Sequence, residues 1–340
     1  MHARARVLLL ASAAMAASAL GQDQAVNLYS ARHYDTDEAL YANFTRATGI
    51  RVHRIEASDD QLLERIRNEG ANSPADVLLI VDAARLTNAE QLKLLAPLKS
   101  RILEQRIPPE VRHPQGLWFG FSSRARVIVY DAKSVNLRDV QRYEDLAAPA
   151  NKGKVCTRPG SHPYMLSLVS AMIEHLGEAR AEAWARGVVA NFARPPRGGD
   201  TDQIRAVAAG ECGVALTNSY YLVRLIRSTK PEDRAVAQAV GLVWPDQNGH
   251  GTHMNISGGG LVRNAPHRDN AIRFLEYLAS DEAQTYFANG NNEWPVVRSA
   301  VAGNPELAAL GNFRRDPLSI AALGRNVAAA QRIVDRVGWR

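Results

Sequence analysis

Four tyrosines occupy the same kind of position in this sequence, where an expected strand gives way to an expected helix. Tyr34 follows "VNLYS", Tyr164 follows "GKVCT", and the pair Tyr220 and Tyr221 follows "CGVALT". A single tyrosine at such a place is more often a packing residue, because its ring is apolar and its hydroxyl is wetted. Four of them at equivalent junctions predict a gathered set of phenols, and therefore a binding site.

Phenols alone make an ordinary polar pocket, because a free phenol has a pKa of about 10 and is neutral at pH 7. A hard, highly charged cation stabilises phenolate, and the positive end of a helix dipole favours the same anion. Copper(I) and structural zinc prefer thiolate, and calcium takes carboxylate and carbonyl oxygens. Ferric iron fits best, since four phenolates would carry four negative charges against its three positive ones.

Two further side chains are placed beside these phenols by their spacing. His33 adjoins Tyr34, and it is either a metal ligand or a hydrogen-bonding partner that orients one. Arg224 lies four residues after Tyr220 and three after Tyr221, on the same side of a helix. It either offsets surplus phenolate charge or is a solvated helix arginine.

The elements that must position these residues alternate along the chain. "VNLYS", "IRVHRIEA" and "ADVLLIVD" are expected strands, with a helix ending at Gly49 and another running from Ser58 to Gly70 between them. This order predicts a doubly wound α/β sheet with helices on both faces. A second unit has strands in "GKVCT" and "CGVALT", with a helical stretch over 163–192, a helix in "DTDQIRAVAAG" and another from Ser219.

Two extended segments are expected to cross between these units, one at 116–131 and one near residue 250. Two crossings make a hinge, and ligands bind α/β sheets at the carboxyl ends of their strands. The expectation is a two-lobed fold with an interlobe cleft, the N-terminal lobe comprising 22–122 and 250–300 and the C-terminal lobe 123–249 and 301–340. The alternative is a single large α/β domain with long loops.

Composition agrees with two cores, since the chain has 340 residues, of which 46% are hydrophobic and 22% are charged. Residues 1–21 resemble a cleavable signal peptide, with Arg4 and Arg6 before a small, apolar run, so cleavage is expected before Gln22. The run is too short to span a membrane, and no cysteine near it offers a lipid anchor. The mature protein is expected to be exported and free of stable membrane insertion.

Charge and cysteine content narrow the partners. The formal charge is +6, and loss of two arginines with the signal leaves 39 basic against 35 acidic residues, or +4. The basic residues are scattered, which argues against a nucleic-acid partner.

Cys156 and Cys212 lie on the strands that lead to Tyr164 and to Tyr220. Adjacent strands would bring their α-carbons within bridging range, and export favours a disulfide over two free thiols.

The stretches "LYSARHYDTDEALYANFTRATGI", "GSHPYML", "TNSYYLVRL" and "GHGTHMNISGGGL" together resemble the periplasmic ferric-iron-binding proteins that serve bacterial iron ABC importers. The resemblance covers essentially the whole mature chain. It implies a type II periplasmic-binding-protein fold and a monomer that binds Fe(3+), passes it to an inner-membrane ABC permease and does no chemistry on it. The implied ligands are Tyr34, Tyr164, Tyr220 and Tyr221, with His33 in some members. The chain is most similar to the tyrosine-rich subgroup, which binds iron without a borrowed anion.

Two other interpretations compete. "NGHGTHMN" contains the His-Gly-Thr-His sequence of subtilisin-type proteases, but no Gly-Thr-Ser nucleophile motif follows, so an enzyme is not expected. An importer receptor for an organic cation, such as a polyamine or a thiamine-like solute, could share the two-lobed fold. It would want tryptophan faces and carboxylates in the cleft, and the five tryptophans do not cluster at strand ends.

Overall fold

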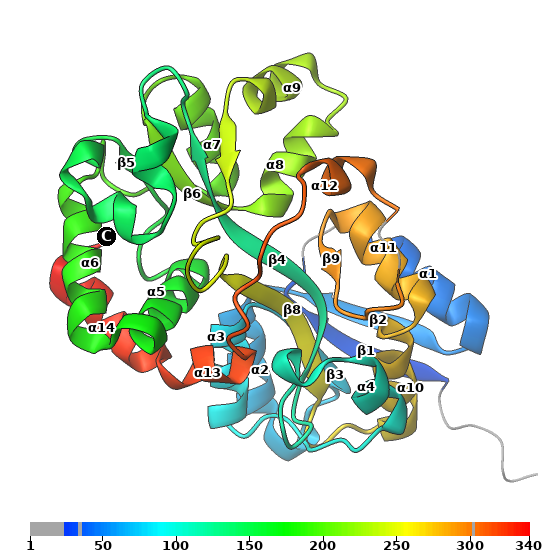
Figure 1. The fold of residues 1–340 in the computed structure, drawn as a ribbon. Coiled ribbons are helices and arrows are strands. Elements are labelled where there is room, and N and C mark those ends of the chain that lie inside the picture. The colour runs from blue at the N-terminus through cyan, green and yellow to red at the C-terminus, as the bar shows by residue number, and fades with distance from the viewer. Residues whose placement is uncertain (1–23, 33–35, 301–302) are drawn as a thin grey trace, which may run out of the picture.

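One sheet runs through both predicted groups of elements (Figure 1). The structure is a computed structural model that describes residues 24–32, 36–300 and 303–340. The strand order is β2-β1-β3-β8-β4-β6-β5, and β7 and β9 also pair with β4. The fold is the two-lobed α/β architecture expected from the sequence.

The strands are β1 Ala25–Ser30, β2 Arg51–Glu56, β3 Val77–Val81, β4 Phe119–Tyr130, β5 Val155–Cys156, β6 Val214–Asn218, β7 Gly241–Val243, β8 Met254–Leu261 and β9 Trp294–Pro295. The helices are α1 Asp37–Thr48, α2 Asp59–Glu69, α3 Ala83–Gln91, α4 Arg101–Arg106, α5 Pro163–Leu176, α6 Glu178–Ala190, α7 Asp200–Ala208, α8 Ser219–Ile226, α9 Pro231–Gln238, α10 Arg268–Leu278, α11 Asp281–Asn291, α12 Pro305–Ala309, α13 Ile320–Arg325 and α14 Val327–Val337.

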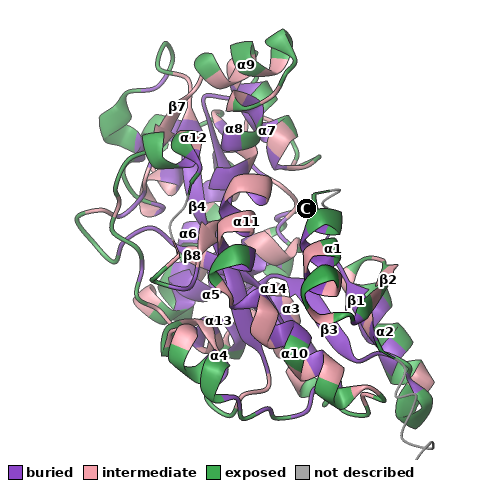
Figure 2. Cartoon of the chain, turned by 90° about the vertical axis from the view of Figure 1, so that its right-hand side faces the viewer, coloured by how far each residue is buried: buried purple, intermediate pink, exposed green. Residues whose placement is uncertain are grey.

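In the first lobe, β1 lies between β2 and β3 and is parallel to both, as a βαβαβ unit requires. Side chains alternate between the faces of the sheet. Leu28 and Leu79 join the core under α1, α10 and α11, whereas Tyr29 and Leu78 join the core under α2 and α3. Figure 2 shows β1 and β3 mostly in the buried colour, whereas the edge strand β2 has only intermediate and exposed residues.

The second lobe is built on the other half of β4. There β6 pairs with β4 in the antiparallel sense, and β5 is parallel to β6. Residues of α5, α6 and α14 form one core, and residues of α7, α8 and α9 pack in another. Helices therefore cover both faces of this sheet too.

Strand β4 is the first crossing between the lobes. It pairs with β8 as far as Ala125 and with β6 from Arg126 onward. The second crossing is the segment between β7 and β8, which contains His253. Near the C-terminus, α12 packs against α8, and α13 packs against both α3 and α5. The lobe boundaries given above stay a prediction.

Local signals in the sequence mark most helix ends correctly. Gly49 has a φ of 74° and ends α1, and Ser58 with Gln61 forms the capping box of α2. The expectation of one helical stretch over 163–192 was wrong, because Gly177 separates α5 from α6 with a φ of 82°. That left-handed conformation is one that glycine adopts without steric cost.

The predicted disulfide is present. Cys156 and Cys212 are bonded, with their α-carbons 5.9 Å apart. Cys156 ends β5, and Cys212 lies two residues before β6 rather than within it. In the part of the chain that the structure describes, no helix has both the length and the apolar character needed to cross a membrane.

Candidate metal centre

A cavity of about 410 Å³ opens where the two lobes face each other. Its first wall contains Ala31 after β1, Ser58 to Asp60 at the start of α2, and Val81 at the end of β3. Its second wall follows β5 and β6 and carries three of the predicted tyrosines. The cavity therefore lies at the carboxyl ends of strands from both lobes, as the doubly wound architecture predicts.

Three of the predicted tyrosines meet in this cavity. Tyr164 is in the first turn of α5, and Tyr220 and Tyr221 are in the first turn of α8. The phenol oxygens of Tyr164 and Tyr220 are 3.2 Å apart, and the ring of Tyr221 stacks on that of Tyr220 with centroids 4.2 Å apart. Helix N-termini point their positive dipole ends toward this region, which favours phenolate there.

His33 and Tyr34 lie outside the described residues. By sequence they fall between β1 and α1. Their role in metal binding stays a prediction, as does that of the three tyrosines that the structure brings together.

Three guanidinium groups surround the ring of Tyr164. The Cζ atoms of Arg124, Arg126 and Arg158 lie 5.2, 5.9 and 5.1 Å from its centroid. Arg124 and Arg126 are two residues apart on β4, so their side chains leave the same face of the strand. The sequence analysis singled out none of the three. Arg124 and Arg126 stand in "SSRARV", which resembles an ordinary strand with polar alternate residues.

Two buried carboxylates hold these arginines in place. Asp82 lies 3.6 Å from Arg124, and Asp200 contacts Arg126 at 2.6 Å and Arg158 at 3.3 Å. Glu293 also lies close enough to Arg124 to raise its pKa, so three guanidiniums and these three carboxylates form one buried charged network beside Tyr164. A buried guanidinium of this kind stabilises an anion, here a phenolate, at the neighbouring oxygen.

The pKa values of the arginines reflect the same coupling. Burial lowers the pKa of Arg124, but Tyr164, Asp82, Glu293 and Tyr220 together raise it above its ordinary value. For Arg158, burial also lowers the pKa, and Asp200 and the three tyrosines raise it overall. Both arginines therefore keep their charge at the wall of the cleft.

His162 links Arg158 to Tyr164. Its Nδ1 accepts a hydrogen bond of 3.2 Å from the backbone N–H of Tyr164, which caps α5, and its Nε2 lies 2.6 Å from Nη1 of Arg158. Burial, together with the charge of Arg158, lowers the pKa of His162 to about 2, so the imidazole is neutral. We infer that His162 orients Tyr164. The sequence signal for it was its place immediately before Pro163, the first residue of a helix.

Arg224 lies where its spacing predicted. Its Cζ is 5.9 Å from the ring centroid of Tyr220 and 5.4 Å from that of Tyr221, and it lines the cavity. The second wall thus gathers four arginines around three phenols.

The first wall carries acidic residues that the sequence analysis did not single out. Asp59 accepts a hydrogen bond of 3.3 Å from the backbone N–H of Val81, and Asp60 pairs with Arg85. Burial raises the pKa of Asp59 to about 6, with Asp82 adding to the shift and Arg85 opposing it. The β2–α2 junction is one more place where a strand gives way to a helix, and that signal would have located these residues.

The chemistry of the cleft is that of hard oxygen donors beside fixed positive charge. Phenolate oxygens suit a small, highly charged cation. The surrounding guanidiniums favour the deprotonated donors that such a cation needs.

Comparison with known proteins agrees with this geometry. Residues 72–310 match the family model described as "Bacterial extracellular solute-binding protein". The chain belongs to this family. The resemblance to periplasmic binding proteins that was stated from the sequence is confirmed. Members of this family are solute-binding proteins rather than enzymes.

Several similar proteins are named for iron uptake or iron binding. The chain is 50% identical to "Iron uptake protein A2" of Synechocystis sp. over 95% of this chain and 92% of that protein, and 48% identical to "Iron uptake protein A1" of the same organism over 94% and 89%. A solved structure titled "Trichodesmium (IdiA) (FutA) in complex with iron and citrate ligands" is 53% identical and covers 93% of this chain and all of that one, with a TM-score of 0.89. The "Ferric binding protein from Campylobacter jejuni" has the same TM-score at 36% identity, with coverage of 93% and 100%.

The His-Gly-Thr-His sequence lies at the hinge of this solute-binding protein, away from the tyrosine cleft. His250 stacks on His175 with ring centroids 3.8 Å apart, and His253 is buried between β7 and β8. Its surroundings are the crossing segments of the fold.

Proposed function

We propose that this solute-binding protein captures ferric iron between its lobes through tyrosine phenolates and delivers it to an ABC permease. The observation that carries the proposal is the meeting of Tyr164 and Tyr220, 3.2 Å apart at two helix N-termini, within a ring of buried arginines. The proposed ligands are Tyr34, Tyr164, Tyr220 and Tyr221, with His33 as a ligand or an orienting partner. The names of the similar iron uptake and ferric-binding proteins support this function.

The charge balance of the cleft supports a trivalent cation. Four phenolates and Fe(3+) leave one net negative charge. The guanidinium of Arg158 beside Tyr164 and that of Arg224 beside Tyr220 and Tyr221 are placed to offset that charge. We propose Arg224 as a residue that neutralises the phenolates rather than as a ligand.

Location and partner belong to the same proposal. Residues 1–21 act as a signal peptide that directs the mature chain to the periplasm, where it works as a monomer. The receptor then passes iron to an inner-membrane ABC permease. Lobe boundaries at 122/123, 249/250 and 300/301 place the hinge where β4 and the segment before β8 cross.

The organic-cation alternative would use the carboxylates of Asp59 and Asp60 on the first wall. Among the described residues that line the cleft, however, there is no tryptophan, and its second wall is strongly positive, which repels a cationic organic solute.

Tyrosine-to-phenylalanine variants test the proposal, because they remove hydroxyls and leave the rings. Tyr164→Phe, and the double variant Tyr220→Phe with Tyr221→Phe, should bleach the visible ferric-phenolate band and weaken iron binding sharply. Tyr130→Phe, at the far end of β4, is the matched control and should keep both. Metal analysis after dialysis against ferric iron gives the stoichiometry. Full colour and full affinity in the cleft variants would refute phenolate coordination.

A further inference from the structure

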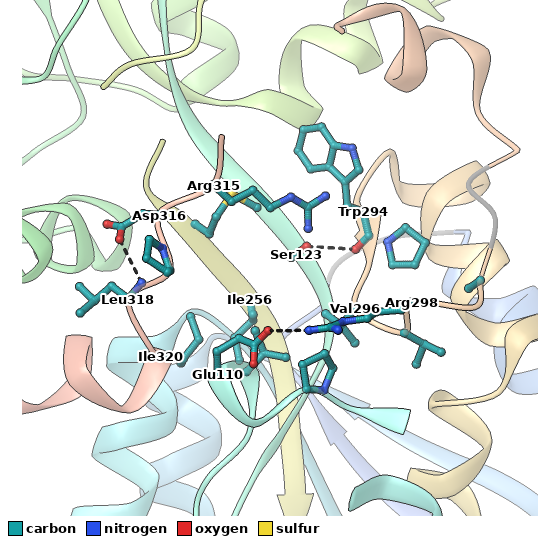
Figure 3. Close-up of a pocket in the computed structure, with 17 residues that line it drawn as sticks. Glu110, Ser123, Ile256, Trp294, Val296, Arg298, Arg315, Asp316, Leu318 and Ile320 are labelled. Atoms are coloured by element: carbon teal, nitrogen blue, oxygen red, sulfur yellow. Dashed lines mark hydrogen bonds and ion pairs between the residues drawn. The ribbon is translucent and has the colours of Figure 1, made fainter. Parts of the chain in front are cut away.

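A second cavity, of about 550 Å³, is lined by residues of the crossing strands β4 and β8 and of the segment before α13 (Figure 3). Side chains alternate along β4, so Ser123 faces this cavity, whereas Arg124 faces the tyrosines. On β8, Met254 and Ile256 face it in the same way. Two paired strands therefore separate two cavities, and only one of them is used by the proposed iron chemistry.

The walls of this rear cavity are mostly apolar. Val111, Ile256, Val296, Leu318 and Ile320 line it, together with the face of Trp294. Its volume falls within the range of small-molecule sites, which combine apolar walls with a few polar groups. An apolar body is therefore what the cavity can hold.

Arg315 supplies the polar group. Its side chain extends along the cavity toward Trp294 (Figure 3), with its Cζ 5.7 Å from that ring centroid and 5.6 Å from the centroid of Phe313. Trp244 stacks on Phe313 at 3.9 Å, which fixes the aromatic platform beneath the guanidinium.

No carboxylate neutralises Arg315 in the part of the chain that the structure describes. The two acidic side chains at the cavity have other partners: Glu110 lies 3.7 Å from Arg298, and Asp316 is bonded to Nε2 of His175 at 2.7 Å. The cavity thus presents one unneutralised planar cation above an apolar floor.

We propose that the rear cavity binds a small organic monocarboxylate with an aromatic or aliphatic body. The carboxylate pairs with the guanidinium of Arg315, a geometry in which two parallel N–H···O bonds form. The body lies against Trp294, Ile256 and Leu318. This ligand is distinct from the iron, because β4 and β8 lie between the two sites.

The test is a calorimetric titration of the iron-free protein with 4-phenylbutyrate. We expect saturable binding of one equivalent, with 4-phenylbutyramide, which has the same shape and no charge, binding about tenfold more weakly or worse. Arg315→Gln should weaken the acid to the level of the amide. Arg314→Gln, at the neighbouring arginine that does not line the cavity, is the control and should bind as the unaltered protein does.

A second arm separates the two cavities. The double variant Tyr220→Phe with Tyr221→Phe should bind 4-phenylbutyrate as tightly as the unaltered protein, since the phenols lie across the strands. Loss of binding in that variant would place the carboxylate in the tyrosine cleft and overturn the proposal. Equal affinity for acid and amide, equal affinity in Arg315→Gln, or no binding up to about 10 mM, a concentration that corresponds to under 3 kcal/mol of binding free energy, would each do the same.

Discussion

Arg158→Gln is the sharpest test of how the second wall assists iron binding. The variant removes a positive charge whose Cζ lies 5.1 Å from the ring centroid of Tyr164. Glutamine keeps hydrogen-bonding capacity near His162, and Asp200 keeps its 2.6 Å contact with Arg126. The change is therefore mainly electrostatic.

The size of the effect follows from the charge of the loaded centre. Four neutral phenols that become phenolates around Fe(3+) leave one net negative charge. At about 5 Å and an effective dielectric constant of about 20, a guanidinium stabilises that charge by about 3 kcal/mol. Asp200 shares the charge of Arg158, whose side chain is 14% exposed, so we expect about half of this. A loss of about 1.5 kcal/mol of binding free energy raises the dissociation constant for iron roughly tenfold.

The measurement is competition for ferric iron against a chelator of known affinity at fixed pH, followed by the visible band. Arg205→Gln is the matched control, because Arg205 on α7 pairs with Asp233 at the surface and its loss makes the same change in net charge. Melting temperatures of both iron-free variants check that the fold is intact. If Arg158→Gln and Arg205→Gln hold iron equally well, the electrostatic role of Arg158 is refuted.

Three other outcomes follow from features described above. Replacing Cys156 and Cys212 by alanine should lower the free energy of unfolding in urea by about 4 kcal/mol, as the chain-entropy estimate gives for cysteines 56 residues apart, and should leave the visible band unchanged. Burial, with Glu144, raises the pKa of Asp246 to about 7. The native state therefore holds a proton that the unfolded chain loses near pH 4, and the free energy of unfolding falls as the pH rises from about 4 to about 7. Asp246→Asn, which tolerates the φ of 59° there, should flatten this fall by about 1 kcal/mol in denaturation curves at several pH values; an unchanged slope would contradict it. Ferric iron should raise the melting temperature, and it should make the particle more compact in small-angle scattering because ligands from both lobes meet one ion only in a closed cleft. A raised melting temperature with an unchanged scattering profile would indicate a site within one lobe.

The alternation of strands and helices, and with it the position of the cleft, could be predicted from the sequence because each junction carries its own local signal. The capping box at Ser58 and the glycine at position 49 fixed two helix ends. Gly177 offered the same kind of signal, but helix-forming residues continue on both sides of it, so two helices were taken for one.

The arginines around Tyr164 could not be predicted in this way. Arg124 and Arg126 look like the solvent-facing residues of a half-exposed strand, and only the packing of α5 against β4 turns them into buried neighbours of a phenol. Their burial depends on Asp82 and Asp200, which lie 42 residues before and 74 residues after them in the chain. Such pairings are tertiary, and no local period records them.

The pairing of β4 with β8 shifts register between Gly120 and Ser122, where Phe121 has no opposite residue. This bulge determines which alternate residues of β4 face the tyrosine cleft and which face the rear cavity. Without it, Arg124 would lie opposite Met254 instead of Asn255 and would point away from Tyr164. The register of β4 after Phe121 thus places its arginines on one side of the sheet and the residues that face the apolar cavity on the other. Inserting or deleting one residue of β4 beyond that point would move every following side chain to the opposite face of the sheet. Such a change would alter both cavities at once, whereas a substitution would alter only the cavity that its side chain faces.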